Sequence, residues 1–78
     1  MSDPEIEEIS LTLTRLAKPK TTPRELLKAV RKRHPEASKR AIVRAAFYST
    51  IANADSDPAK AAMLQGFAIG ERASGELE

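Results

Sequence analysis

Apolar side chains recur every three or four positions through most of the chain, which is the spacing of one face of an α-helix. Four such stripes follow one another along the sequence. They consist of Ile6, Ile9, Leu13 and Leu16 in residues 4–17; Leu26, Leu27 and Val30 in residues 23–33; Val43, Ala46, Phe47, Thr50 and Ala54, flanked by Ile42 and Ile51, in and just after residues 37–53; and Met63, Leu64 and Phe67 in residues 58–72. The alternation at residues 10–14 is also typical of a strand, but a lone short strand would have no partner. The pattern therefore predicts four helices.

Three of the predicted helices begin with the same local signal, a capping side chain followed by proline. The pairs are Asp3-Pro4, Thr22-Pro23 and Asp57-Pro58. The fixed φ of proline suits the first helical position, and the preceding oxygen accepts a hydrogen bond from an amide that has no partner inside the helix. Glu25 completes a capping box with Thr22, so the second helix has the best-defined start.

Short connections place successive helices side by side, as in a compact bundle. We therefore expect a single all-α domain over residues 1–78, with residues 1–3 and 73–78 as frayed ends. The connection of about four residues between the second and third helices is compatible with a helix-turn-helix, although no glycine marks the turn. The pattern leaves that arrangement open.

Composition excludes several classes of function. The 78 residues include no cysteine, so disulfides, thiolate metal ligands and cysteine nucleophiles are absent. The apolar stripes make a core too small to surround a deep substrate pocket. The first residues lack the basic and apolar regions of a secretory signal, and no apolar run approaches the roughly 20 residues that span a bilayer. We expect a cytoplasmic protein with no membrane partner.

The formal net charge of +2 averages three unlike segments. Residues 1–14 carry four acids and no base, and residues 45–78 carry five acids and two bases. Between them, residues 15–44 carry eleven bases and only two acids. Most charge runs on small helical domains are solvated faces that keep the protein in solution. This local excess of bases exceeds that need and favours an anionic partner.

Helical spacing gathers these bases on two faces. In the second helix they fall opposite the leucines, and in the third helix Arg40, Arg44 and Tyr48 form an i, i+4, i+8 row beside the core stripe. Ala41 and Ala45 adjoin this row and would let the helix approach a groove closely, while arginines form bidentate bonds with phosphate or guanine. Tyr48 also suits a partly buried ring with a solvated hydroxyl. The candidate nucleic-acid-binding residues are Arg24, Lys28, Arg31, Lys32, Lys39, Arg40, Arg44 and Tyr48.

Other polar and small residues have structural explanations. His34 is the single histidine and has no second ligand at metal-binding spacing, so an interaction with the helix dipole explains it better. Asp55 and Asp57 flank a turn, where capping explains them better than acid–base catalysis. Gly66 and Gly70 indicate close packing of another helix, or else a contact between two copies or with a partner. We expect no metal, no cofactor and no enzymatic activity.

Two functions remain. The first is a small nucleic-acid-binding module that uses the basic face of residues 24–48. The alternative is a non-enzymatic protein-interaction domain, which either binds an acidic partner on the same face or self-associates through the fourth helix. The sequence contains no motif that separates them.

Overall fold

The computed structural model describes residues 4–18 and 20–74, and these residues form four α-helices without a strand. The helices are α1 (Pro4–Leu16), α2 (Pro23–Arg33), α3 (Lys39–Asn53) and α4 (Pro58–Ser74). The predicted all-α class is confirmed. The helix α3 begins two residues after its predicted start, and α4 ends two residues after its predicted end. Residues 1–3, with the predicted cap at Asp3, and residues 75–78 lie outside the described residues. Residues 73 and 74, which were expected to belong to the frayed C-terminal end, are part of α4.

Side-chain caps fix the starts of three helices. Thr22 and Glu25 form the reciprocal capping box at α2. The Ser38 hydroxyl oxygen accepts from the Ala41 amide at 3.1 Å, and the Asp57 carboxylate accepts from the Lys60 amide at 3.1 Å. Ser38 therefore caps α3, which begins at Lys39, because the Ser38 oxygen satisfies an amide that lacks a partner inside the helix.

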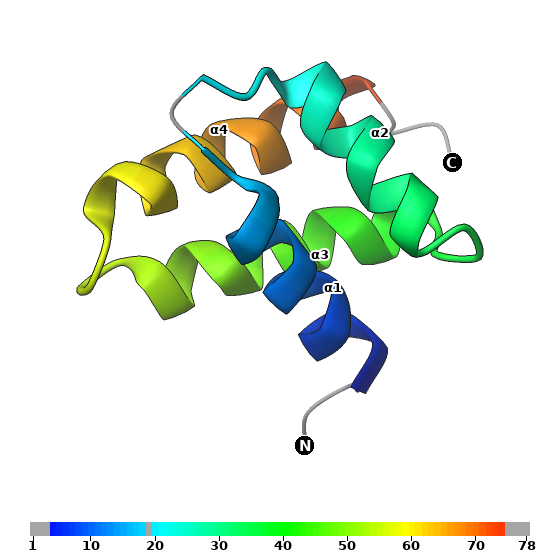
Figure 1. The fold of residues 1–78 in the computed structure, drawn as a ribbon, viewed down its shortest axis with the longest axis horizontal. Coiled ribbons are helices and arrows are strands. Elements are labelled where there is room, and N and C mark those ends of the chain that lie inside the picture. Colours follow the sequence, from blue (N-terminus) through cyan, green and yellow to red (C-terminus); the bar gives the residue numbers. More distant parts are fainter. Residues whose placement is uncertain (1–3, 19, 75–78) are drawn as a thin grey trace.

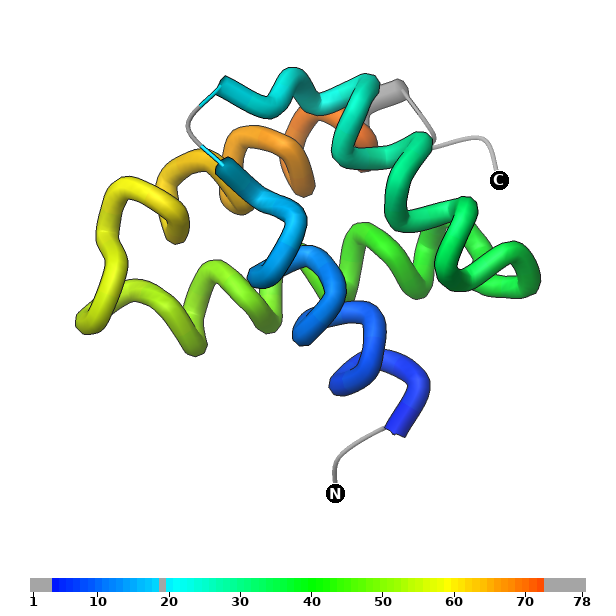
Figure 2. Tube along the Cα trace, in the orientation of Figure 1, coloured from blue at the N-terminus to red at the C-terminus, as the bar shows by residue number. Residues whose placement is uncertain are grey.

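The four helices form two hairpins (Figure 1). The first hairpin consists of α1 and α2, and the second consists of α3 and α4. In Figure 2, α3 and α4 lie side by side and run in opposite directions, α1 crosses in front of α3, and α2 returns alongside α1. The closest packing is between α3 and α4 and between α1 and α3, whereas α2 packs chiefly on α1. This order makes α3 the central helix and leaves most of α2 open to solvent.

The core contains most of the predicted apolar residues together with a set of alanines. Ile9, Leu13, Leu26, Ile42 and Leu64 have no exposed surface. The other buried apolar residues are Ala17, Val30, Ala37, Ala41, Ala45, Ala46, Ala61, Phe67 and Ala68. The small side chains between the larger ones allow the helices to approach closely, and they are concentrated on α3.

The buried face of α3 differs from the predicted stripe. Val43 and Phe47 are only partly buried, and Ile51 is 78% exposed. The buried residues of this helix are Ala41, Ile42, Ala45, Ala46 and Ser49. Both α1 and α4 pack against α3, so small side chains occupy the interface while larger ones lie at its margins. The predicted surface of Ala41 and Ala45 beside the arginine row is therefore wrong, because both alanines belong to the core.

Polar contacts hold the C-terminal end of α1 against both helices of the second hairpin. The Asn53 side-chain amide of α3 donates to the Thr14 hydroxyl oxygen at 3.2 Å, and the Lys60 ammonium of α4 donates to the Thr14 carbonyl at 2.8 Å. Ser49 is fully buried, and its hydroxyl donates to the carbonyl of Ala45. Among the described residues, every buried side-chain polar atom has a partner. These bonds fix the point from which the chain turns into α2.

Gly66 and Gly70 do not face another helix of this chain. Both residues are exposed, and a Cβ atom built on either would meet no atom within 4 Å. The first interpretation of these glycines, close packing of another helix within the domain, is therefore wrong. The second interpretation, a contact with another molecule, is untested.

We expect Ala45→Leu to destabilise the domain by about 1–3 kcal/mol, because the larger side chain must be forced into the core beneath α3. Ala52→Leu is the matched control, since Ala52 lies on the same helix and is exposed. Its effect should stay within about 0.5 kcal/mol. Urea unfolding followed by circular dichroism measures both. Equal effects would mean that Ala45 faces solvent, as the sequence pattern suggested.

Candidate nucleic-acid interface

The outward face of α2 consists largely of basic side chains. Arg24, Lys28, Arg31 and Lys32 are all exposed, as predicted from their position opposite the leucines. Arg33 is exposed as well and belongs to the same helix, although it was not among the candidates. On the other side of α2, Leu26 and Val30 are fully buried and Leu27 is partly buried. The helix thus separates its apolar and basic faces cleanly.

The N-terminus of α2 is fixed by Thr22 and Glu25. The Thr22 amide donates to Glu25 Oε1 at 3.0 Å, its hydroxyl donates to the same oxygen at 3.2 Å, and the Glu25 amide donates to the hydroxyl oxygen at 3.1 Å. The bond from the Thr22 amide, followed by that from its hydroxyl, holds the pKa of the Glu25 carboxyl below its ordinary value. The only acid on α2 is therefore engaged in capping.

The C-terminus of α2 is tied to α1 through His34. The His34 amide donates to the Val30 carbonyl at 2.8 Å and closes the last turn. The His34 Nε2 atom lies 2.8 Å from the Thr12 hydroxyl oxygen, and the Thr12 hydroxyl donates to the Glu8 carbonyl at 3.1 Å. His34 thus anchors the basic helix. Sequence spacing could not reveal this contact, because its two residues are 22 positions apart.

Arg31–Arg33 of α2 and the first turn of α3 meet at one corner of the molecule (Figure 1). Residues 34–38 connect the two helices, and the Ala37 amide donates to the His34 carbonyl at 3.0 Å within this turn. Arg40 and Arg44 are exposed on α3, and Tyr48 is 46% exposed one turn further along. The predicted row of three side chains is thus available to a partner.

Lys39 differs from the other candidate bases. Its ammonium group lies 3.3 Å from a carboxylate oxygen of Glu71 on α4, and both side chains are largely buried. This ion pair joins the start of α3 to the end of α4. Lys39 therefore contributes to the packing of the second hairpin, and its charge is balanced locally.

The arrangement of α2 and α3 departs from a tight helix-turn-helix. The connection of five residues is longer than the usual three or four, and α2 packs chiefly on α1 rather than on α3. Both α1 and α4 pack on α3, so only a strip along α3 is open. The most accessible basic element is α2.

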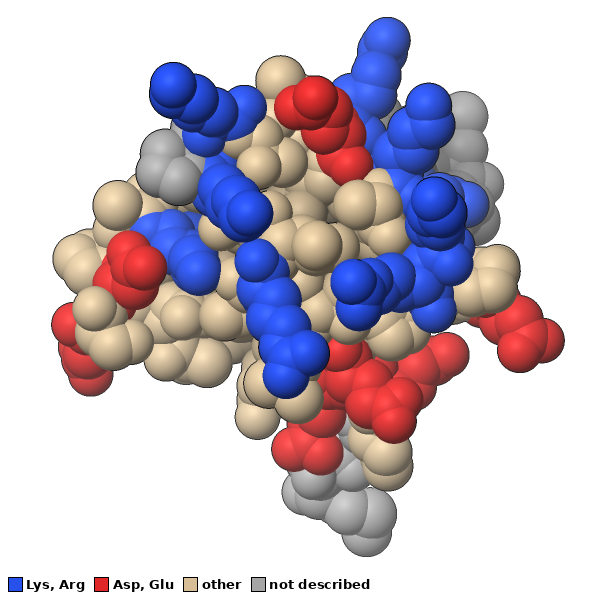
Figure 3. Space-filling model, in the orientation of Figure 1, with Lys and Arg blue, Asp and Glu red and all other residues tan. Residues whose placement is uncertain are grey.

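The positive charge of the exposed basic side chains is not neutralised by ion pairs with the described acids. Within residues 4–18 and 20–74, no ion pair involves Arg24, Lys28, Arg31, Lys32 or Arg40. In Figure 3, lysines and arginines gather over α2 and over the connection between α1 and α2, while acids gather at the N-terminal end of α1. The charge segregation along the sequence is thus also a segregation in space.

The part of the chain that the structure describes contains no group of three or more histidine, aspartate or glutamate residues placed to hold a metal ion. In that same part, none of the helices combines the length and the apolar character needed to cross a bilayer.

Comparison of the chain with protein-family models, with curated proteins and with solved structures finds no match.

The Glu25 cap predicts a pH dependence. The pKa of Glu25 is lower in the folded domain than its ordinary value of 4.5. The ionised carboxylate therefore stabilises the domain at any pH above 4.5, and this stabilisation is lost as the pH falls through the lowered pKa. We expect the difference in unfolding free energy between wild type and Glu25→Gln to be largest near neutral pH and to narrow in acid. Urea unfolding over a pH series measures it. Glu36→Gln is the matched control, because it removes an exposed carboxylate that makes no capping bond. Parallel curves for wild type and Glu25→Gln would contradict the proposed cap.

Proposed function

We propose that this domain binds nucleic acid through the phosphate backbone, using the outward face of α2 and the exposed arginines of α3. The observation that carries the proposal is the row of exposed bases on α2, which have no ion-pair partner among the described residues. Arginine forms two parallel hydrogen bonds with a phosphate, and lysine supplies a compact positive charge. The expected residues are Arg24, Lys28, Arg31, Lys32, Arg40 and Arg44.

Backbone contact suits this surface better than reading of base edges. A recognition helix must enter the major groove with its side chains leading. Here α3 has neighbours on two sides, and Ala41, Ala45 and Ala46 are buried, so Arg40, Arg44 and Tyr48 are offered along a narrow strip. Phosphate contacts fix orientation without reading the sequence. We therefore expect binding that depends weakly on DNA sequence and strongly on salt.

The test is fluorescence anisotropy with a labelled DNA duplex of about 20 base pairs at several salt concentrations. If four to six phosphates are neutralised, the logarithm of affinity should fall with the logarithm of salt at a slope of about −4 to −5. The double variant Arg31→Gln/Arg40→Gln should weaken binding at low salt and make that slope shallower by about two. Both side chains are exposed, so folding should be unaffected.

The matched control is Arg15→Gln/Lys20→Gln, which also removes two exposed positive charges but lies outside the proposed interface. It should retain nearly the wild-type slope. Equal losses in the two double variants would show that overall charge, and not this face, attracts DNA. Absence of any binding at about 50 mM salt would exclude the proposal, because electrostatic contacts are strongest there.

The alternative function, self-association through α4, is favoured by a different observation. The exposed residues of α4 between 59 and 70 carry no charge, in a chain of which 31% is charged. These residues are Ala59, Ala62, Gln65, Gly66, Ile69 and Gly70. Each glycine in an exposed helix costs about 1 kcal/mol relative to alanine. Close approach of a second α4 would offset that cost.

The variant Gly66→Ala/Gly70→Ala tests this alternative. In a monomer the added methyl groups meet nothing within 4 Å, so the variant should be more stable by about 1–2 kcal/mol. If two copies pair through α4, the same methyl groups should weaken the dimer in sedimentation equilibrium. A chain that stays monomeric at millimolar concentration would exclude self-association and leave the DNA proposal untouched.

A further inference from the structure

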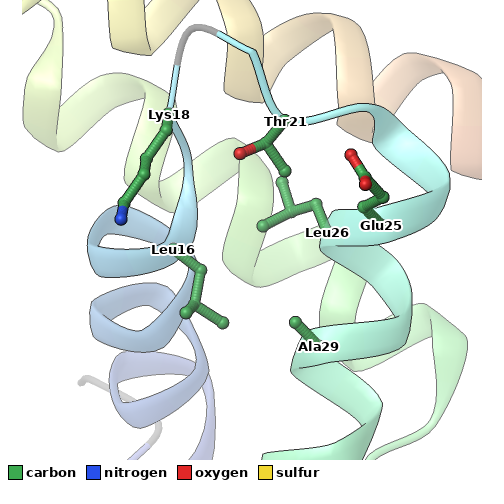
Figure 4. Close-up of a pocket in the computed structure, with 6 residues that line it drawn as sticks. All are labelled: Leu16, Lys18, Thr21, Glu25, Leu26 and Ala29. Atoms are coloured by element: carbon green, nitrogen blue, oxygen red, sulfur yellow. The ribbon is translucent and has the colours of Figure 1, made fainter.

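A groove runs between α1 and α2 and lies apart from the outward basic face of α2. Near the connection between the two helices it widens into a hollow of about 290 Å³ (Figure 4). Leu16 from α1 and Ala29 from α2 point toward one another across it, and Leu26 also points into the gap. Thr21 and Glu25 lie at its upper end, and Lys18 lies along α1 at the rim.

A second hollow of about 210 Å³ continues the groove toward the other end of α2. It shares Leu16 with the first hollow, and Leu11, Thr12, Arg15 and Arg33 line it together with Glu8. The contact between Thr12 and His34 lies beside this end. The two hollows thus lie along α2 from Arg33 to the turn at Thr21, and α2 itself has 11 residues, or about three helical turns.

The floor of the groove is aliphatic. Leu11 lies outside the core stripe of α1 and is 63% exposed. Leu16 and Ala29 are partly exposed beside it. Together they offer a strip that binding of apolar side chains would bury. Among the described lining residues none is aromatic, so the groove lacks the platforms on which bases of single-stranded nucleic acid stack.

The rim of the groove is predominantly positive. Arg15, Lys18 and Arg33 are exposed around it, and none of them makes an ion pair within the described residues. Two acids also line the groove: Glu25, which keeps its negative charge while it is hydrogen-bonded to Thr22, and Glu8 at the other end. The three bases therefore outnumber the acids by one. An apolar floor between positive rims is complementary to a segment that combines aliphatic and acidic side chains.

We propose that the α1–α2 groove binds an acidic amphipathic helix of a partner protein, with aliphatic side chains on Leu11, Leu16 and Ala29 and carboxylates beside Arg15, Lys18 and Arg33. The length of the groove matches about three turns of such a helix. This site does not depend on the proposed binding of nucleic acid, because its apolar contacts come from the inner side of α2 and from α1.

The probe is a capped peptide of about 14 residues made only of leucine and glutamate, with leucines at helical i, i+3, i+4 and i+7 spacing. Titration into the ¹⁵N-labelled domain should shift the amides of Leu11, Leu16, Thr21 and Ala29. A second peptide in which alanine replaces every leucine keeps the charge and removes the apolar anchors. It should bind at least about tenfold more weakly.

Leu11→Ser should weaken binding of the leucine peptide by about fivefold or more, because it removes an apolar contact in the groove. Ile51→Ser is the matched control, since Ile51 is also a large aliphatic residue exposed on the surface but lies on α3 outside the groove. It should change the affinity by less than about twofold. Arg15→Gln should weaken binding by about two- to fivefold at low salt and less at about 200 mM salt.

Three results would overturn the proposal. Equal binding of the leucine and alanine peptides would show that charge alone attracts them. Equal effects of Leu11→Ser and Ile51→Ser would exclude the groove as the site. Shifts of the groove amides by duplex DNA, with displacement of the peptide, would assign the groove to nucleic acid. DNA binding is measured separately, by anisotropy with the Arg31→Gln/Arg40→Gln variant. Failure of the groove proposal therefore does not affect the test of DNA binding.

Discussion

The close approach of α1 and α4 to the small side chains of α3 is the contact on which the rest of the fold depends. Ala45, Ala46 and Ser49 have no exposed surface, and they admit a helix on either side of α3. A larger residue at one of these positions would separate the helices and open the core around Ile42 and Leu64. Because α1 and α4 occupy both flanks of α3, the remaining helix has to pack on α1. The position of α2 at the outside of the bundle follows from this.

That position explains why the charges gather where they do. A helix that packs on one neighbour needs only a narrow apolar stripe, and α2 supplies it with Leu26 and Val30. The rest of its surface is free to carry bases, whereas a base on the inner face of α3 would have to be desolvated. Lys39 shows the consequence, since it lies at the α3–α4 junction and is paired with Glu71. Exposed and paired bases therefore differ in whether the side chain lies at a contact between two helices, because Arg40 and Arg44 lie on the same helix as Lys39 and are exposed.

The sequence predicts where the helices begin better than it predicts which of their faces are buried. Thr22, Ser38 and Asp57 act through residues three positions away, so local chemistry is sufficient to place them. The orientation of α3 could not be read in this way. The apolar residues of α3 are spread over more than half of its circumference. Only the packing of α1 and α4 against it determines that Ala45 is buried while Ile51 is exposed. The tie between Thr12 and His34 also requires the fold, because it joins two helices. The exposure of the α2 bases was predictable from their place opposite the leucines, whereas the α1–α2 groove was not.

The two proposed surfaces share α2 but depend on forces of different range. The outward bases attract an anion over a Debye length of about 8 Å at physiological ionic strength, and salt weakens that attraction uniformly. A ligand in the proposed groove would be bound at contact distance through Leu11, Leu16 and Ala29, and removal of apolar surface from water is little affected by moderate salt. About 100° of rotation around one helix separates residues such as Lys28 from Ala29. A ligand in the groove would leave the outer face of α2 positive, so the two proposed ligands need not exclude each other.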